Sequence, residues 1–232
     1  MKYTVLVGDI PDEAFDTLSR LPETETVIKL PPDSLIDSPI KSHPDTILCI
    51  HGGKLYCHNL YARENEELLL DICRKGNLTL SPQEGERNGK YPFDCAFNAL
   101  NMGERILGRK QSLCPPLSDI CINVNQGYAA CCALYAGDTV ISADPAIIKV
   151  CKAHGITVFP VAGGDILLPG YNTGFIGGAG GFCENRIFIF GESDGITGHA
   201  LSLFCREKGF ELISLCRGIL TDYGGIKFIP TA

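Results

Sequence analysis

Residues 170–192 read GYNTGFIGGAGGFCENRIFIFGE, a stretch in which seven glycines lie mostly beside strongly apolar residues. The hydrophobic pattern in and after this stretch predicts four elements, in the order strand 174–182, strand 186–190, helix 196–208 and strand 210–215. Glu184 and Asn185 predict the turn between the two strands, and Gly209 is a natural end for the helix. The stretch therefore begins a unit of strand, strand, helix and strand.

The same unit is expected upstream, in the order strand 128–135, strand 139–142, helix 146–154 and strand 156–161. Asp144 and Pro145 predict an N-cap followed by proline at the first helical position, and Gly155 predicts the end of the helix. Because two distant segments share one order of elements and the same punctuation, a repeat is the simplest interpretation.

Three further copies complete the pattern. One has strands 45–51 and 54–58, helix 64–75 and strand 77–80; the second has strands 94–100, 104–107 and 120–124; and the third has strand 3–7, helix 11–20 and strand 26–30. In the second of these, Pro115 and Pro116 predict that the helix is short and interrupted. The N-terminal copy lacks its first strand, and residues 224–229 are expected to supply it by pairing with 3–7. Five units of about 45 residues that close in this way predict a ring and a single domain over 1–232. The alternative is an ordinary α/β sheet.

A five-fold ring of such units, completed by a Gly-Gly strand near the C-terminus, resembles the pentein or guanidine-modifying-enzyme fold, an α/β propeller. The motifs that carry the resemblance are NQGYA, GGDI, GFIGGAGG and DYGGIKF. The superfamily includes arginine deiminase, agmatine deiminase, dimethylarginine dimethylaminohydrolase and the amidinotransferases. The chain is similar most of all to an uncharacterised bacterial family of this fold. The resemblance implies a site on the pseudo-five-fold axis.

The fold accounts for the glycines of residues 170–192, because glycine is needed where strands crowd near an axis. A phosphate-binding loop would instead be followed by a helix, and the Walker type by Lys and then Ser or Thr. Here Phe182 and Cys183 follow Gly181, and a second strand comes next.

The residues that precede each first strand are expected to converge on one cavity at the axis. The candidate ligand-binding residues are Asp94, Gln126, Asn172 and Asp222, together with Asp165 in the loop that leaves a third strand. Carboxylates and amides suit a planar cation such as guanidinium, whose N–H groups form a fixed fork. The alternative interpretation is that Asp45, Asp94 and Asp222 cap turns at equivalent positions.

His43 and Asp45 form an H-x-D pair before the second unit, and the resemblance implies an acid/base role for such a histidine. They are the candidate catalytic residues. The enzymes of the superfamily attack with a cysteine on the last strand, but this chain has Ile226, Lys227 and Phe228 there. Without a positioned thiolate that mechanism is lost, unless Cys131 or Cys132 replaces it.

Composition excludes several classes of function. The formal net charge of the 232 residues is -7 and no basic cluster is present, which argues against a nucleic-acid partner. No apolar run is long enough to span a membrane, the N-terminus is not typical of a signal peptide, and we expect a cytoplasmic protein. The twelve cysteines include no C-x-x-C pair and are expected to act as small hydrophobes.

The sequence therefore favours a small-molecule-binding protein with an acidic axial pocket, for a guanidino, amidino or amino-acid-like ligand. It predicts no cofactor and no metal. A divergent hydrolase or amidinotransferase that uses His43 is one alternative. A non-catalytic structural or partner-binding protein, whose axis is filled by side chains, is the other.

Overall fold

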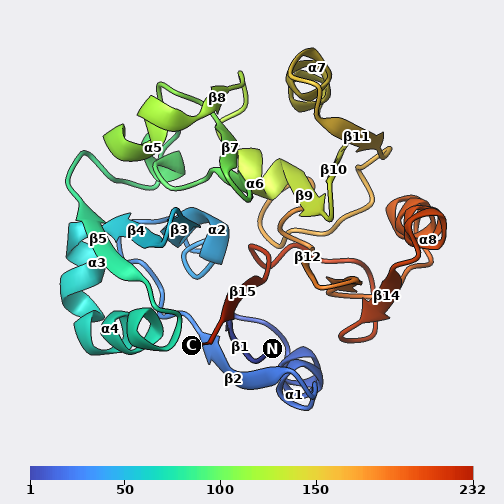
Figure 1. Ribbon diagram of the computed structural model, residues 1–232, viewed down its shortest axis with the longest axis horizontal. Coiled ribbons are helices and arrows are strands. Elements are labelled where there is room, and N and C mark those ends of the chain that lie inside the picture. Colours follow the sequence, from blue (N-terminus) through green and yellow to red (C-terminus); the bar gives the residue numbers. More distant parts are fainter. Residues whose placement is uncertain (232) are drawn as a thin grey trace.

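The computed structural model describes residues 1–231, which form five three-stranded sheets arranged in a ring (Figure 1). In each sheet the central strand pairs antiparallel with the inner strand and parallel with the outer strand. A tight turn can join the antiparallel pair, whereas the parallel pair requires a crossover, which a helix supplies.

The sheets, each from inner to outer strand, are β15 (Lys227–Pro230), β1 (Tyr3–Val7) and β2 (Thr24–Lys29); β3 (Leu48–His51), β4 (Lys54–His58) and β5 (Thr79–Gln83); β6 (Leu100–Met102), β7 (Arg105–Gly108) and β8 (Ile122–Asn123); β9 (Ala133–Ala136), β10 (Thr139–Ser142) and β11 (Thr157–Pro160); and β12 (Gly180–Cys183), β13 (Arg186–Ile189) and β14 (Glu211–Ser214). β15 pairs antiparallel with β1, with Tyr3 opposite Pro230 and Leu6 opposite Lys227. The first and last strands of the chain therefore lie in one sheet.

The crossover helices lie on the outside of the ring (Figure 1). They are α1 (Asp12–Ser19), α3 (Asn59–Glu64), α4 (Glu66–Lys75), α5 (Pro115–Ile120), α7 (Pro145–Ala153) and α8 (Ile196–Lys208). In α7 the carboxylate of Asp144 accepts hydrogen bonds from the N–H groups of Ala146 and Ile147, as its sequence predicts. α8 ends at Gly209, which has a left-handed conformation. Each helix buries an apolar face against its own sheet, for example Leu201 and Phe204 of α8.

The inner strands surround the axis, and β12 lies between β9 and β15. A side chain at Gly181 would place its Cβ 2.8 Å from the Cβ of Ile226, a separation that real side chains do not adopt. The glycines of β12 are therefore required by the close approach of neighbouring backbones, which is the role that the sequence predicts for them.

All five inner strands begin later than the sequence predicts, β12 at Gly180 in place of 174 and β15 at Lys227 in place of 224, and a helical turn precedes the other three. The turns are α2 (Pro44–Ile47) before β3, the 3₁₀ turn Phe93–Cys95 before β6, and α6 (Ala129–Cys132) before β9. The prediction for Pro115 and Pro116 was also wrong in part: the helix is short, but the prolines begin it and do not interrupt it. Proline fits there because the first helical residues need no N–H partner.

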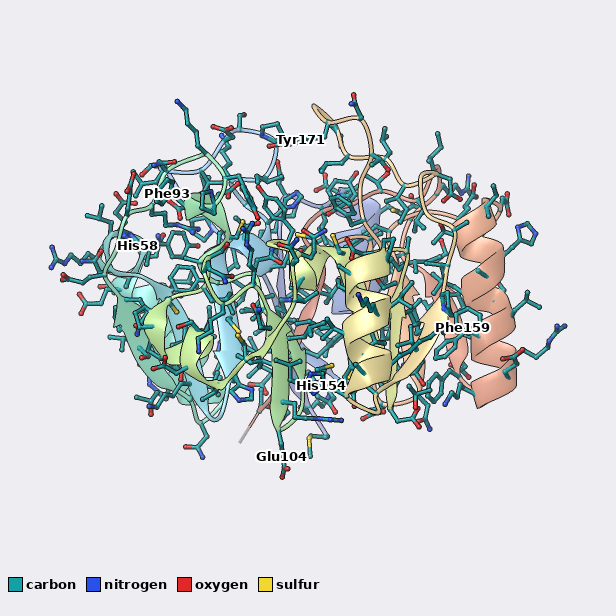
Figure 2. The ribbon with its side chains drawn as sticks, turned by 90° about the horizontal axis from the view of Figure 1, so that it is seen from above. His58, Phe93, Glu104, His154, Phe159 and Tyr171 are labelled. Atoms are coloured by element: carbon teal, nitrogen blue, oxygen red, sulfur yellow. The ribbon has the colours of Figure 1, made fainter. Side chains whose placement is uncertain are left out.

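The two ends of the ring differ, as the side view shows (Figure 2). Tyr171 and Phe93 mark the end at which the chain enters the inner strands, which we call the entry end. Glu104, in the turn between β6 and β7, lies at the opposite end. No helix among residues 1–231 is long and apolar enough to cross a membrane. The twelve cysteines are free thiols, and all except Cys121 are buried, as expected for small hydrophobes.

Candidate functional site

A cavity of about 310 Å³ opens at the entry end of the ring, where Tyr171 lies (Figure 2). We call it the entry cavity. Its chemically active lining residues come from four separate segments of the chain: His43, Tyr128, Cys131, Asn172, Thr173 and Asp222. Apolar and aromatic side chains, among them Leu168 and Phe175, form the rest of its wall. The expectation that the loops before the inner strands meet in one place holds for His43, Asn172 and Asp222.

Asp222 is the one carboxylate that lines the entry cavity among residues 1–231, and only 1% of its surface is exposed. One carboxylate oxygen accepts a hydrogen bond from the N–H of Phe175, and the other accepts one from the N–H of Gly224, both at 3.0 Å. The absence of side chains at Gly174 and Gly178 makes room for this carboxylate, because a Cβ at either position would collide with Asp222. The glycine-rich stretch therefore shapes the cavity as well as the strand.

Asp45 is a second buried carboxylate; it does not line the entry cavity, but its charge acts on Asp222. One of its oxygens accepts a hydrogen bond of 3.3 Å from the Thr46 hydroxyl, whereas its Oδ2 is buried without a hydrogen-bond partner among the described residues. Burial and the negative charge of Asp45 raise the pKa of Asp222 to about 7. Asp222 therefore changes its charge in the physiological range.

His43 is the N-cap residue of α2 and is 5% exposed. Its Nδ1 lies 3.7 Å from Asp222 Oδ1, which is too long for a hydrogen bond. Burial lowers the pKa of His43 below its usual value, so the imidazole is neutral at neutral pH. The histidine consequently does not balance the negative charge of the two carboxylates.

Cys131 places a thiol in the same cavity, from helix α6. The Asn98 side chain holds this turn: its oxygen accepts hydrogen bonds from the N–H groups of Ala130 and Cys131, and its nitrogen lies 3.1 Å from Cys131 Sγ. Burial and the neighbouring charges of Asp45 and Asp222 raise the pKa of Cys131 well above its usual value. The thiol is therefore protonated at neutral pH and is not an activated nucleophile.

Asp94 does not line the entry cavity but contacts a residue that does. Its carboxylate accepts a 2.6 Å hydrogen bond from the hydroxyl of Tyr128, a lining residue. Burial, together with this carboxylate, raises the pKa of Tyr128. The sequence predicted Asp94 as a ligand residue; its direct ligand contact stays a prediction, and the observed partners of its carboxylate are the Tyr128 hydroxyl and the Cys95 thiol.

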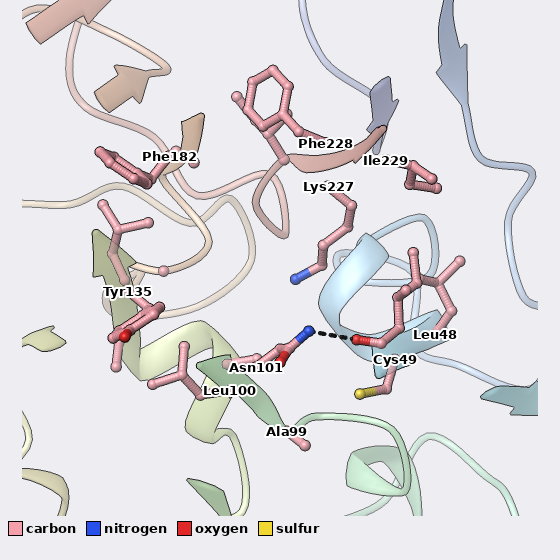
Figure 3. Close-up of a pocket in the computed structure, with 18 of the residues that line it drawn as sticks. Leu48, Cys49, Ala99, Leu100, Asn101, Tyr135, Phe182, Lys227, Phe228 and Ile229 are labelled. Atoms are coloured by element: carbon pink, nitrogen blue, oxygen red, sulfur yellow. Dashed lines mark hydrogen bonds between the residues drawn. The ribbon is translucent and has the colours of Figure 1, made fainter. Parts of the chain in front are cut away.

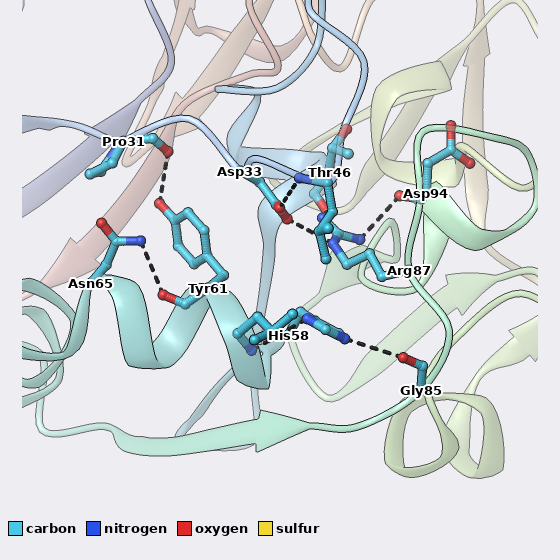
Figure 4. Close-up of polar contacts among 11 residues, drawn as sticks. Pro31, Asp33, Thr46, His58, Tyr61, Asn65, Gly85, Arg87 and Asp94 are labelled. Atoms are coloured by element: carbon cyan, nitrogen blue, oxygen red, sulfur yellow. Dashed lines mark hydrogen bonds and ion pairs between the residues drawn. The ribbon is translucent and has the colours of Figure 1, made fainter.

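Arg87 connects three segments beside the entry cavity through hydrogen bonds (Figure 4). The sequence predicts no role for it. Its guanidinium donates to Asp33 Oδ2 at 2.7 Å and to the carbonyl oxygens of Thr46 and Asp94 at 3.0 and 3.5 Å. The side chain is fully buried and stacks over the ring of Phe97. Among residues 1–231 the one charged partner of Arg87 is Asp33, so this cation does not pair with Asp45 or Asp222.

Gln126 and Asp165 lie away from the entry cavity. The Gln126 amide donates to Asp144 and accepts from the N–H of Tyr128, next to the start of α7. Asp165 accepts hydrogen bonds from the hydroxyl and the N–H of Thr197 and thereby caps α8. Burial acts to raise the pKa of Asp165, but these hydrogen bonds outweigh burial and the pKa is lowered. Ligand contacts of both residues stay predictions.

A signal for the role of Asp165 exists in the sequence. The residue directly before α8 is Gly195, which has no side chain with which to cap the helix. A helix without a local cap obtains one from elsewhere or leaves its first N–H groups unpaired.

Among residues 1–231, no group of three or more His, Cys, Asp or Glu residues is arranged to hold a metal ion.

Comparison with known proteins gives one family and one fold. The model of the family described as Family of unknown function (DUF6873) matches residues 6–227. The sequence has no significant match among curated proteins. Two similar solved structures are of dimethylarginine dimethylaminohydrolase: a histidine-to-glycine variant as an adduct with S-methyl-L-thiocitrulline, and a cysteine-to-serine variant from Pseudomonas aeruginosa complexed with citrulline.

Both structures have a TM-score of 0.54 and cover 92% of either chain, with sequence identities of 7% and 8%. At such low identity the similarity concerns the fold alone. It confirms the predicted fold, a five-fold α/β propeller.

Proposed function

This chain belongs to the DUF6873 family, and from that premise and its α/β-propeller fold we propose that it binds a small cationic ligand in the entry cavity. The ligand class is a guanidinium or amidinium compound, or an amino-acid-like compound that carries one. The proposal treats the chain as a binding protein.

The observation that carries the proposal is the uncompensated pair of carboxylates Asp45 and Asp222. Both are about 1% exposed, and no Lys or Arg among the described residues forms an ion pair with either. Burying carboxylates without a cation is costly, and a bound cation would remove that cost. The raised pKa of Asp222 expresses the same cost.

The remaining lining residues suit a planar cation. Asn172 and Thr173 line the cavity together with Asp222 and carry side-chain oxygens. The rings of Tyr128, Tyr171 and Phe175 face the same space and can stabilise a cation over an aromatic face. The citrulline and S-methyl-L-thiocitrulline of the two structures with this fold also carry a planar nitrogen-containing head group.

Binding is favoured over turnover because the cavity lacks an activated nucleophile. β15 carries no cysteine, and the Cys131 thiol, which does line the cavity, has a raised pKa. The alternative function is a hydrolase or amidinotransferase in which His43 deprotonates Cys131. That alternative requires the Cys131 pKa to fall when ligand binds, and it predicts citrulline, urea or ammonia as a product.

The test is calorimetric titration of the full chain with arginine, agmatine, methylated arginines, creatine and simple amino acids. We expect at least one guanidino compound to bind, and to bind more weakly by about tenfold or more in Asp45→Asn, because one of the two buried negative charges that attract the cation is lost. Asp119→Asn, which changes an exposed carboxylate on α5, is the matched control and should bind normally.

Absence of binding by every cation in the panel would overturn the proposal. So would a ligand that binds Asp45→Asn as tightly as it binds the unmodified protein. Release of a product that stops in both His43→Ala and Cys131→Ala would replace the binding function by the catalytic one.

A further inference from the structure

A second cavity, of about 380 Å³, lies on the axis between the inner strands of all five sheets (Figure 3). We call it the axial cavity. It shares no lining residue with the entry cavity. Helix α6 separates the two, because Ala130 lines the axial cavity and the next residue, Cys131, lines the entry cavity. The two spaces are therefore distinct sites.

Among residues 1–231, Lys227 is the single charged residue that lines the axial cavity. Its side chain extends from β15 into the cavity toward Asn101 of β6 (Figure 3). No Asp or Glu lines the cavity, and among residues 1–231 Lys227 takes part in no ion pair. The Asn101 amide is already engaged, since it donates to the carbonyl of Ile50. Lys227 is thus half-buried and presents its ammonium, without an ion-pair partner among residues 1–231, to the axial cavity.

The walls around this ammonium combine polar and apolar surface in similar amounts, and the apolar part comes from large side chains. Tyr135, Phe182 and Phe228 contribute aromatic side chains, and Leu48 and Leu100 contribute aliphatic ones (Figure 3). The thiol of Cys49 also faces the cavity, and burial raises its pKa to about 12, so that it adds no charge. A lysine beside large apolar side chains in a cavity suits an anion attached to an apolar body.

We propose that the axial cavity binds a small monocarboxylate with an aliphatic or aromatic body, whose carboxylate pairs with Lys227. One lysine supplies one positive charge, which matches a monoanion. An inorganic phosphate or a phosphorylated ligand usually requires several cations or a cluster of backbone N–H groups. Here the glycine N–H groups nearest the cavity are occupied: that of Gly177 donates to the carbonyl of Cys131.

The proposal is independent of the function assigned to the entry cavity, because it concerns an anion, other residues and a separate space. The test is titration of the full chain with benzoate, phenylacetate and hexanoate. Binding is measured by calorimetry, and the residues that respond are identified by backbone amide NMR. Benzamide and benzyl alcohol serve as neutral counterparts, and inorganic phosphate as a small anion without an apolar body.

We expect a carboxylate to bind at least about tenfold more tightly than its neutral counterpart. The NMR shifts should concentrate at residues 49, 135, 182 and 227–229. Lys227→Met should abolish the preference for the charged compound, and Lys227→Arg should retain it. Lys54→Met, which alters an exposed lysine at the start of β4, is the matched control and should behave like the unmodified protein.

Three results would overturn the proposal: no binding of any carboxylate at millimolar concentration, shifts that map elsewhere on the unmodified protein, or equal affinity in Lys227→Met. Tighter binding of phosphate than of the carboxylates would overturn the ligand class. If Lys227→Met does not fold, Lys227→Gln and the NMR map of the unmodified protein still decide the matter. Asp45→Asn should leave carboxylate binding unchanged, so failure here is distinguishable from failure of the cation site.

Discussion

Asp222 and Asp45 occupy positions where an ordinary protein would place a neutral side chain or a salt bridge. The surrounding backbone accommodates Asp222. Gly174 and Gly178 leave space for its side chain, and the N–H groups of Phe175 and Gly224 donate hydrogen bonds to its oxygens. Such accommodation of an unpaired charge costs stability. The cost is the physical argument that these residues serve binding.

The pH dependence of stability follows from the same pair. An unfolded aspartate ionises near pH 4, whereas Asp222 in the folded protein ionises near pH 7. Between these values the folded state holds a proton that the unfolded state has lost, so the free energy of unfolding contributed by Asp222 falls as pH rises from about 4 to about 7.

Asp45→Asn removes one of the two causes of this shift, so Asp222 should ionise at a lower pH. The free energy of unfolding of the variant minus that of the unmodified protein should therefore depend on pH. We expect this difference to be about 1 kcal/mol more favourable to the variant at pH 8 than at pH 5. Urea unfolding at the two pH values measures the difference. Asp119→Asn is expected to give parallel profiles, and an Asp45→Asn variant that loses stability specifically at pH 8 would contradict the account of the pair.

The elements that present the cavity are short helical turns, and their positions depend on contacts between distant parts of the chain. α6 is held by Asn98, whose side-chain oxygen caps its N–H groups from about 30 residues upstream. Local sequence predicts a strand for YAACCALY because the apolar run is continuous. No local pattern could reveal the cap, which explains why the helical turns before β3, β6 and β9 were missed.

Arg87 performs the corresponding task for α2 and the turn Phe93–Cys95, by donating to the carbonyls of Thr46 and Asp94 (Figure 4). Removing one partner of a buried ion pair leaves the other charge buried and unpaired. We therefore expect Arg87→Met to lower the free energy of unfolding by about 3–5 kcal/mol, as measured by urea denaturation.

Two comparisons sharpen this expectation. The double variant Arg87→Met with Asp33→Asn should be less destabilised than the sum of the two single changes, since neither charge is left alone. Arg74→Met, which breaks an exposed ion pair with Asp71, should change stability far less. Equal effects of Arg87→Met and Arg74→Met would contradict the role assigned to Arg87.

For the whole molecule, periodicity and punctuation predicted the fold because each unit repeats one order of elements and each helix carries its own signals. The bounds of α8 agree with those expected from the sequence, and Gly209 ends it as predicted. The site was less predictable. Position before an inner strand identified His43, Asn172 and Asp222 as cavity residues, but it could not show that Gln126 and Asp165 turn toward helices α7 and α8.

The sequence could not predict the positions of Arg87 and Cys131 for a related reason. Arg87 sits in a segment without periodic pattern, and Cys131 reaches the entry cavity only because α6 replaces the start of a strand. In each case a contact made across the ring, and not a local preference, decides which way a side chain points.

The most direct test of the central claim is the pH dependence of agmatine binding, measured by calorimetry in buffers with different ionisation enthalpies. A cation that pairs with Asp222 requires the ionised carboxylate. Affinity should therefore fall about tenfold for each pH unit below about 7, level off above it, and be accompanied by proton release near pH 7. Affinity that is independent of pH, or that strengthens toward acid, would contradict the claim that the buried carboxylates of the entry cavity bind a cation.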